Sequence, residues 1–314
     1  MHKVSVVMAC YNGEKKMECI LDSLRRQTRL PDEVLMPDDC STDQTVCVIR
    51  EYINKYHIDN WSVAENEQNL GWKRNFMQGL IRAKGDLLFL CDQDDSWEPE
   101  KIRKMEEAME QNPGIDLLAC DYDIQYGDGS IPLKKYRKRK QERTGETARY
   151  QFTSRFFQNA SPGCTYAVRK SFLNRVKDYW FEDAPHDEFL WLMAAMEDGA
   201  WFMNRKLMTM YRGTENASDI RYKDISIQKK NLEYISVMLE KMDQAAAAFA
   251  DRVPEDHKKH IQKAKEWCRK RQRLMDTRNP FHWLTLMPYW RYYNSRKNCL
   301  SDLYLVLFGS FSRK

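Results

Sequence analysis

Residues 85–97 of this 314-residue chain read Gly85-Asp86-Leu87-Leu88-Phe89-Leu90-Cys91-Asp92-Gln93-Asp94-Asp95-Ser96-Trp97. The apolar run 87–91 is short and is bounded by glycine and by charge, a pattern that predicts a buried β-strand. Three carboxylates follow within four residues, and like charges this close destabilise one another unless a cation neutralises them. A hard divalent ion such as Mg²⁺ takes carboxylate oxygens and substrate phosphates as ligands. The stretch therefore predicts a metal site at a strand end. The competing interpretation is an acidic turn before a helix with Pro99 in its first turn.

The first 120 residues alternate strand-like and helix-like patterns. Short apolar or β-branched runs predict strands at residues 4–9, 34–36, 61–64, 87–91 and 116–120. Apolar residues at helical spacing predict helices at residues 17–24, 41–49, 72–83 and 101–109. Ser41, with Gln44 three residues later, has the spacing of a capping box, so we expect the second helix to begin there. Strands that alternate with helices predict an α/β fold whose sheet is mainly parallel and covered on both faces.

Three loops follow predicted strands: Cys10–Gly13, Asp38–Asp43 and Asp92–Asp95. In open α/β sheets, ligands bind outside the carboxyl ends of the strands, where the connecting loops gather. We therefore expect the three loops to converge at one edge of the sheet. This convergence favours a metal site over a simple helix cap for the acidic stretch.

The composition is that of a soluble, globular protein, with 42% hydrophobic residues, 31% charged residues and a net charge of +5. The length fits one large domain, or a catalytic domain with an appendage. The nine cysteines include no Cys-x-x-Cys pair, which indicates reduced thiols in a cytoplasmic protein. We find no secretory signal and no run of roughly 18 apolar residues, so we do not expect an integral membrane protein. The basic residues lack a recognition motif, which argues against nucleic-acid binding.

Two later segments carry charged residues of interest. The basic run 134–140 is interpreted either as a solvated surface loop or as an electrostatic grip on a phosphate-bearing or membrane-bound substrate. Pro185-His186-Asp187-Glu188 opens an apolar helix that we expect to continue through Met196. An acid at such a helix start is commonly an N-cap.

Read in order, short motifs along the first two thirds of the chain resemble those of one enzyme family. They are 4–13, 33–45, Asn69-Leu70-Gly71 with Arg74-Asn75, Asp92-Gln93-Asp94-Asp95 with Trp97, Gly163-Cys164-Thr165, His186-Asp187 and Tyr211-Arg212. Together they resemble glycosyltransferase family 2, the inverting enzymes with a GT-A fold, over about residues 3–218. The resemblance implies a GT-A catalytic domain at 1–218, with a Rossmann-like, mainly parallel sheet flanked by helices. It leaves a C-terminal helical region at 219–314.

The resemblance also implies a site for a nucleotide-sugar donor. Ala9, Tyr11 and Glu14 would border the nucleotide. Asp39 would contact the base, and Arg74 would help to hold the base. Asp92 would lie near the ribose. Asp94 would ligate Mg²⁺ or Mn²⁺ on the diphosphate, where the ion stabilises charge on the leaving group. Asp187 would be the general base that takes the proton of the acceptor hydroxyl, and Glu188 is its nearest competitor.

The Asp-Gln-Asp-Asp-x-Trp version of the metal motif is similar to bacterial enzymes that build capsule, O-antigen or exopolysaccharide repeats. The resemblance thus implies a UDP- or dTDP-sugar donor and a saccharide or polyprenyl-diphosphate-linked saccharide acceptor. Two alternatives remain open. One is a nucleotidyltransferase, although Tyr11-Asn12-Gly13 is not the Gly-rich phosphate loop typical of that class. The other is a degenerate sugar-nucleotide-binding protein without transfer activity.

Two positions depart from the family pattern. Cys40 stands where many relatives have glycine. No histidine follows Tyr211-Arg212 to complete the coordination of the metal. Thr214, Glu215 or water would take its place, or Arg212 would neutralise the developing charge instead.

The last hundred residues differ in character from the rest. Helices rich in Lys, Glu, Gln and Ala are predicted at 222–252 and 257–276. The segment 280–293 then sets aromatic residues beside basic ones, and 303–308 is a short apolar run. Either these segments pack on the catalytic domain, or they bind the interface of a membrane, with cations on anionic lipid. The second interpretation places the cytoplasmic protein at the inner face of the cell membrane.

Overall fold

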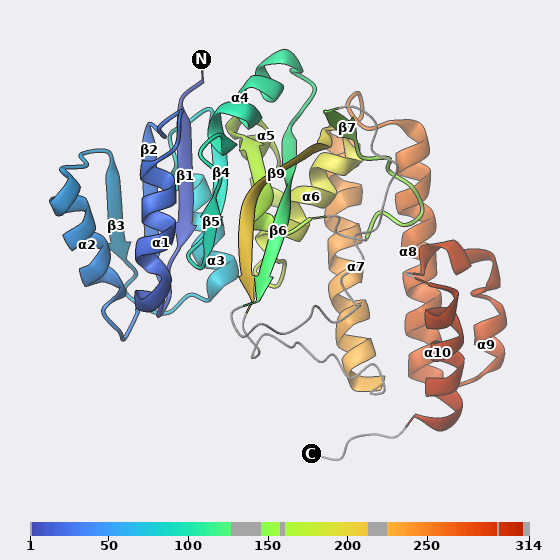
Figure 1. Cartoon of the computed structure of the whole chain (residues 1–314). Helices are drawn as coiled ribbons and strands as arrows, with labels where there is room; N and C mark the ends of the chain where they lie inside the picture. Colours follow the sequence, from blue (N-terminus) through green and yellow to red (C-terminus); the bar gives the residue numbers. More distant parts are fainter. Residues whose placement is uncertain (1, 127–145, 158–160, 213–224, 294, 310–314) are drawn as a thin grey trace.

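The computed structural model describes residues 2–126, 146–157, 161–212, 225–293 and 295–309. Figure 1 shows a sheet flanked by helices, with further helices of the C-terminal part at one end. The basic run 134–140 and the predicted boundary at 218/219 lie outside the described residues. In chain order, the elements are β1 (Val4–Ala9), α1 (Glu14–Arg25), β2 (Glu33–Asp38), α2 (Thr45–Tyr56), β3 (Trp61–Glu65), α3 (Trp72–Arg82), β4 (Leu87–Asp92), β5 (Asp95–Trp97), α4 (Lys101–Gln111), β6 (Leu117–Tyr126), β7 (Thr147–Arg149), η1 (Gly163–Thr165), β8 (Tyr166–Arg169), α5 (Lys170–Val176), η2 (Lys177–Tyr179), α6 (His186–Met196), β9 (Ala200–Arg212), α7 (Ile225–Ala248), α8 (Glu255–Thr277), α9 (Phe281–Leu284), η3 (Met287–Tyr292) and α10 (Arg296–Phe308).

The described strands form one nine-stranded sheet in the order β3-β2-β1-β4-β8-β6-β9-β5, with β7 paired to β9. Strands β1 to β4 are mutually parallel, which confirms the α/β prediction and brings the carboxyl ends of β1, β2 and β4 to one edge. Beyond β4 the sheet is mixed. Strand β8 enters between β4 and β6 and is antiparallel to both, so β6 does not pair with β4 as a simple alternation of strands and helices would suggest.

Alternate side chains of the central strands enter two separate cores. Val7 and Leu88 belong to the core that contains residues of α3, α5 and α6. Val6 and Phe89 belong to the core that contains residues of α1, α2 and α4. Because successive side chains of a strand point to opposite faces, this division shows that helices cover both faces of the sheet.

The local signal at one helix start predicts the wrong residue. The helix expected from Ser41 begins at Thr45, and its N-cap makes no side-chain hydrogen bond. Ser41 donates instead to Asp38, from its hydroxyl to Oδ1 at 2.5 Å and from its backbone nitrogen to Oδ2 at 2.8 Å. These bonds close the turn after β2, so the hydroxyl is not available as a cap. The next helix begins at Lys101, as the pattern at 101–109 predicts, so Pro99 of the competing interpretation lies before the helix, after the short strand β5.

Helix α6 joins the sheet to the C-terminal helices. It contacts β6 and β9 on one side and α7 on the other, and its apolar residues from Phe189 to Met196 are buried. The core around Trp191 continues into Leu232 of α7 and Trp267 of α8. The C-terminal helices α7 and α8 therefore share a core with the sheet.

The elements α9, η3 and α10 lie beside α8, at the end of the molecule opposite α2 and β3 (Figure 1). Leu286, Tyr292 and Cys299 are buried, as the packing interpretation predicts, whereas Phe281 and Phe308 of the same segment are exposed. Among the described residues, no helix combines the length and apolar character needed to cross a bilayer.

Candidate active site

A cavity of about 630 Å³ lies at the carboxyl ends of β1 and β4. The last residues of the two strands, Ala9 and Asp92, are paired in register. The cavity lining includes residues of all three predicted loops, which confirms that the loops converge at one edge of the sheet. Of the residues that the sequence assigned to donor, metal or base, six line the cavity: Ala9, Tyr11, Asp39, Asp92, Asp94 and Asp187.

The side-chain amide of Gln93 ties the first loop to the acidic loop. Gln93 Oε1 accepts a hydrogen bond from Tyr11 N at 2.9 Å, and Gln93 Nε2 donates to Tyr11 O at 2.7 Å. A Cβ on Gly13 would lie 2.5 Å from Gln93 Oε1 and would displace this amide. The glutamine between the two aspartates therefore holds Tyr11 at the cavity wall.

The carboxylate of buried Asp39 organises the loop before α3. Its Oδ1 accepts from Leu70 N at 2.7 Å and from Asn66 Nδ2 at 3.1 Å, and its Oδ2 accepts from Gly71 N at 2.8 Å. Gly71 has φ 78°, a left-handed conformation that favours glycine. Asp39 lines the cavity, and its carboxylate holds this loop in place; its assignment to the base of the donor stays a prediction.

Cys40 takes the backbone conformation for which glycine is best suited. Its φ is 62°, in the left-handed region that side chains with a Cβ rarely adopt. Its thiol donates to Asn66 O at 3.1 Å. Cys40, which departs from the family pattern, thus has a strained backbone. Its thiol also adds a hydrogen bond to the loop that Asp39 holds.

The acidic residues after β4 face different neighbours. Asp92, Asp95 and Cys164 each offer one ligand atom, and these atoms lie within 4.8 Å of one another. Asp94 instead forms an ion pair with Lys16 of α1, at 3.3 Å. Burial, reinforced by the negative charges of Asp95 and Asp94, raises the pKa of Asp92 to about 7.

This set of donors fits a divalent cation. Crowded, buried carboxylates favour a bound cation, and the raised pKa of Asp92 is the electrostatic sign of that crowding. Carboxylate oxygens suit Mg²⁺ and Mn²⁺, and the thiol of Cys164 adds a softer donor. Asp92 and Asp94 both line the cavity, where a substrate diphosphate would supply further oxygens. The candidate replacements for the missing histidine, Thr214 and Glu215, lie outside the described residues, as does the side chain of Arg212.

A buried lysine beside Cys164 was not predicted. Lys101, the first residue of α4, is fully buried, and its Nζ donates to Cys164 O at 2.8 Å. The same atom lies 3.8 Å from the centroid of the Trp97 ring, a cation–π contact that helps to stabilise a buried ammonium group. Lys101 thus places a cation next to the acidic strand end. Sequence offers little signal for this, because a lysine at the start of an amphipathic helix is ordinarily exposed.

Asp187 lies in the first turn of α6 and not at the N-cap, which is Pro185. Its Oδ1 accepts from Glu188 N at 2.9 Å, and the side chain lines the cavity. Glu188 is not among the described residues that line the cavity, and burial raises its pKa beside Tyr234 of α7. Of the two acids, Asp187 is thus the one in the described cavity lining, and its assignment as the general base stays a prediction.

Trp72, Phe76 and His186 contribute an aromatic part of the cavity lining that sequence reasoning did not assign to the site. The rings of Phe76 and His186 stack at 4.2 Å, and Trp72 meets His186 edge-on at 5.7 Å. Burial lowers the pKa of His186 to about 4, so the imidazole is neutral at neutral pH. Trp72 is 54% exposed and lines the cavity. Its place directly after the Asn69-Leu70-Gly71 motif was the available sequence signal.

Two residues predicted to bind the nucleotide are not part of the cavity lining. Glu14 is the first residue of α1, and its Oε2 accepts from Gln44 N at 2.9 Å. Arg74 pairs with Glu182 at 3.0 Å. Neither the carboxylate of Glu14 nor the guanidinium of Arg74 is part of the described cavity lining. The assignment of these two residues to the nucleotide stays a prediction.

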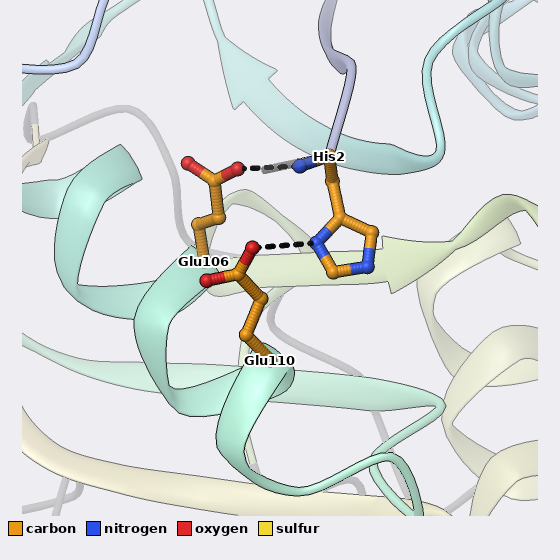
Figure 2. Close-up of side chains that lie close together, drawn as sticks. All are labelled: His2, Glu106 and Glu110. Atoms are coloured by element: carbon orange, nitrogen blue, oxygen red, sulfur yellow. Dashed lines mark hydrogen bonds and ion pairs between the residues drawn. The ribbon is translucent and has the colours of Figure 1, made fainter.

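A second group of side chains able to bind metal lies at the opposite edge of the sheet, before β1. Figure 2 shows that His2 N donates to Glu106 Oε1, at 2.9 Å, and that His2 Nδ1 lies 3.7 Å from Glu110 Oε1. Glu106 also pairs with Arg29, whose Nε is 3.2 Å from Oε2. Because Arg29 already neutralises Glu106, this cluster is explained as the attachment of the chain start to α4.

Sequence comparison matches residues 5–177 to the family described as Glycosyl transferase family 2. The dTDP-rhamnosyl transferase RfbG of Shigella flexneri is 29% identical over 222 residues, covering 67% of this chain and 72% of that protein. The poly(ribitol-phosphate) beta-N-acetylglucosaminyltransferase TarS of Staphylococcus aureus is 32% identical over 120 residues, covering 38% of this chain and 21% of TarS. The match to an uncharacterized glycosyltransferase of Haemophilus influenzae, at 32% identity, covers 37% of this chain and 37% of that protein. The chain thus spans well under half the length of these last two relatives.

Solved structures share the fold. S. aureus TarS in complex with UDP-GlcNAc aligns with a TM-score of 0.60 at 20% identity, covering 99% of this chain and 93% of that chain. The mannosyltransferase PcManGT of Pyrobaculum calidifontis, in complex with GDP-Man and Mn²⁺, aligns with a TM-score of 0.55 at 14% identity, covering 98% of this chain and 87% of that chain. The family match extends over more than half of the chain, and the acidic strand end lies at the cavity that the three loops form. From sequence and architecture together, this chain belongs to glycosyl transferase family 2 and has the GT-A fold.

Proposed function

We propose that the protein is a metal-dependent, inverting glycosyltransferase of bacterial surface-polysaccharide synthesis. It moves a sugar from a UDP- or dTDP-sugar to a saccharide or a polyprenyl-diphosphate-linked saccharide. One observation carries the proposal: Asp92, Asp94 and Asp187 line the same cavity although they come from elements about a hundred residues apart. A donor diphosphate and an acceptor hydroxyl can therefore meet in one place.

On the donor side, Tyr11 and the loop held by Asp39 border the nucleotide, and Asp92 lies near the ribose. A divalent cation held by Asp94 beside Asp92 would supply Lewis-acid stabilisation of the leaving diphosphate. The similarity to RfbG, a dTDP-rhamnosyl transferase, supports a dTDP-sugar, and the fold shared with TarS in complex with UDP-GlcNAc is compatible with a UDP-sugar.

On the acceptor side, the carboxylate of Asp187 takes the proton of the attacking hydroxyl, a contribution of about 10²–10⁴-fold to the rate. The hydroxyl oxygen forms the new bond on the face of the sugar opposite the departing diphosphate, which inverts the anomeric centre. Trp72, half-exposed in the cavity lining, offers a stacking surface for the acceptor saccharide. A lipid-linked acceptor would be met at the cytoplasmic face of the membrane.

The experiment begins with donor binding. Thermal unfolding is measured with UDP-, dTDP- and GDP-sugars, with and without Mn²⁺, and we expect a UDP- or dTDP-sugar to raise the melting temperature most when Mn²⁺ is present. Release of the nucleoside diphosphate is then followed for the wild type, Asp94→Asn and Asp187→Asn. We expect Asp94→Asn to lose both the metal-dependent stabilisation and the release.

The Asp187→Asn variant separates transfer from binding. It should retain stabilisation by the donor and lose at least 10²-fold in transfer rate. Asp59→Asn, which changes an exposed carboxylate outside the cavity lining, should behave like the wild type. A wild-type protein that is stabilised by a donor but releases no diphosphate with any acceptor tested would be a binding protein, and the proposal would fail.

A further inference from the structure

Exposed apolar side chains concentrate in the C-terminal helices. Among the described residues, thirteen large hydrophobic side chains are exposed, and seven of these lie between residues 281 and 308. The seven are Phe281, Leu284, Met287, Leu300, Tyr304, Leu307 and Phe308. Single exposed apolar residues are normal on a protein, but a concentration of them marks an interaction site. We name these seven residues the C-terminal apolar surface.

The two parts of this surface adjoin where α9 meets α10. Trp283 Nε1 donates to Cys299 O at 2.8 Å, which sets the end of α9 beside the first turns of α10. The next residues along the chain, Leu284 and Leu300, are 58% exposed each. The surface therefore continues from one helix to the other.

Helix α10 has one covered face and one uncovered face. The inner face carries Cys299, Asp302 and Leu305, which are buried. The outer face carries Leu300, Tyr304 and Leu307, at the i, i+4, i+7 spacing of a single helix face. A row of apolar residues at this spacing ordinarily faces a core. The outer face of α10 thus has the composition of a covered surface.

The charged side chains within the segment that links and begins these helices have one sign. Residues 277–301 contain no aspartate or glutamate and four cations, Arg278, Arg291, Arg296 and Lys297. Arg291 and Lys297 are exposed, and Lys297 lies one turn before Leu300 on α10. The guanidinium of Arg291 lies 5.5 Å from the ring centroid of Trp290, which pairs a cation with an aromatic ring. Such a combination complements a negatively charged partner that is also apolar.

We propose that the C-terminal apolar surface binds the interfacial layer of an anionic lipid bilayer. The apolar side chains enter the boundary between headgroups and acyl chains, while Arg291 and Lys297 meet the anionic headgroups. A two-fold contact with a second copy would place segment 277–301 of one copy against the same segment of the other. Both segments carry cations and no carboxylates, so they would repel each other. Charge therefore favours lipid over self-association. This inference deepens the proposed function, because it assigns the face through which the enzyme reaches a lipid-linked acceptor.

The test uses the full chain and sedimentation with two kinds of vesicle, phosphatidylcholine alone and phosphatidylcholine with 30% phosphatidylglycerol. We expect binding to the anionic vesicles, weakened by salt, and little binding to the neutral ones. Arg291→Gln with Lys297→Gln should weaken binding about 25-fold, since each cation near an anionic leaflet is worth about fivefold. Leu300→Gln with Leu307→Gln should weaken binding at least tenfold, because both side chains leave the interface.

Matched controls change residues of the same kind elsewhere. Lys84→Gln with Lys259→Gln removes two exposed cations, and Leu30→Gln with Ile81→Gln removes two exposed apolar side chains. All variants should unfold at wild-type temperatures, and the controls should bind vesicles like the wild type. Absence of wild-type binding to anionic vesicles, or equal binding of the surface and control variants, overturns the inference. So does a dimer in sedimentation velocity that Leu300→Gln dissociates.

The result is separable from the transfer reaction. Asp187→Asn lies outside this surface and should bind anionic vesicles as tightly as the wild type while losing transfer to a soluble acceptor. If the wild type binds vesicles but transfers no sugar, the lipid inference is supported and the proposed function is contradicted. If the wild type transfers sugar but does not bind vesicles, the proposed function is supported and the lipid inference is contradicted.

Discussion

The backbone of Gly163 faces the side chain of Asp187 so closely that a Cβ on Gly163 would lie 2.7 Å from the Cβ of Asp187. The same Cβ would lie 3.4 Å from His186 Nε2. Both neighbours belong to the first turn of the largely buried helix α6, so neither can move aside freely. The glycine therefore lets the turn before β8 approach the proposed base.

Gly163→Ala should move Asp187 and slow transfer. Overpacking at such a site costs about 1–3 kcal/mol of unfolding free energy. A displacement of about 1 Å at a reacting group can lower the rate on the order of 10²-fold. Measured kcat should fall while stabilisation by the donor is kept. Gly114→Ala, in an exposed turn where the nearest atom is 3.2 Å away, is the control and should change neither quantity much. A wild-type kcat in Gly163→Ala would contradict the positioning argument.

Substitutions at Cys40 should show the strain of its left-handed backbone. At φ 62° a Cβ is unfavourable, so Cys40→Gly should be more stable than Cys40→Ala by about 1 kcal/mol. Urea denaturation measures the difference. The matched position is Cys19, an exposed residue inside α1, where glycine should instead be about 1 kcal/mol less stable than alanine. The same order of stability at both positions would exclude backbone strain as the cause.

Acid should destabilise the protein through His186. Burial lowers its folded pKa to about 4, whereas an unfolded histidine titrates near 6.5. Below pH 6.5 the unfolded chain therefore binds a proton that the folded chain excludes. The stability that neutral His186 contributes is complete above pH 6.5 and is lost as the pH falls toward 4, by up to about 3 kcal/mol.

The variant His186→Gln isolates this effect. Its unfolding free energy, measured in urea between pH 4.5 and 8, should decline less steeply than that of the wild type below pH 6.5. Above pH 7 the two curves should run parallel, which serves as the internal control. Parallel curves over the whole range would show that His186 does not cause the acid sensitivity.

Metal binding should displace a proton from Asp92. Its pKa of about 7, raised by burial and by the neighbouring carboxylates, means that the metal-free site is partly protonated at neutral pH. A cation competes with that proton, so the affinity for Mn²⁺ should fall as the pH decreases from 7, approaching tenfold per unit when one proton is displaced. Calorimetry in buffers of different ionisation enthalpy measures the protons released.

Asp92→Asn provides the comparison for this pH dependence. The variant should bind Mn²⁺ more weakly at pH 8 and should lose most of the proton release near pH 7. An affinity of the wild type that is constant between pH 6 and 8 would rule out Asp92 as the linked group.

Trp72→Ala should weaken acceptor binding with little effect on folding. The indole is 54% exposed, so the protein depends little on it for stability. Loss of a stacking surface for a sugar ring should raise the KM for the acceptor about tenfold while kcat stays within a few-fold. Ile81→Ala removes an exposed apolar side chain from the same helix, outside the cavity lining, and should leave KM unchanged. An unchanged KM in Trp72→Ala would argue against stacking.

Local pattern was sufficient for most of the parallel half of the sheet. The strands at 4–9 and 87–91 are close to β1 and β4 because short apolar runs bounded by polar turns can be buried on both faces only as strands. Local pattern failed at Ser41, whose hydroxyl had two possible partners. It bonds Asp38 across the turn instead of capping α2, and nothing in the spacing distinguishes these outcomes.

The amino-acid sequence by itself determined the alternation of strands and helices, the acidic strand end, and the family to which the chain belongs, because these depend on residues close together along the chain. Only the tertiary structure decided that β8 enters antiparallel beside β4, that Gly163 abuts Asp187, and that buried Lys101 lies beside Cys164. It also decided that one face of α10 stays exposed. These relationships join residues that are far apart in the chain. Bringing such residues together costs chain entropy, and the packing that offsets this cost is not encoded in any local pattern.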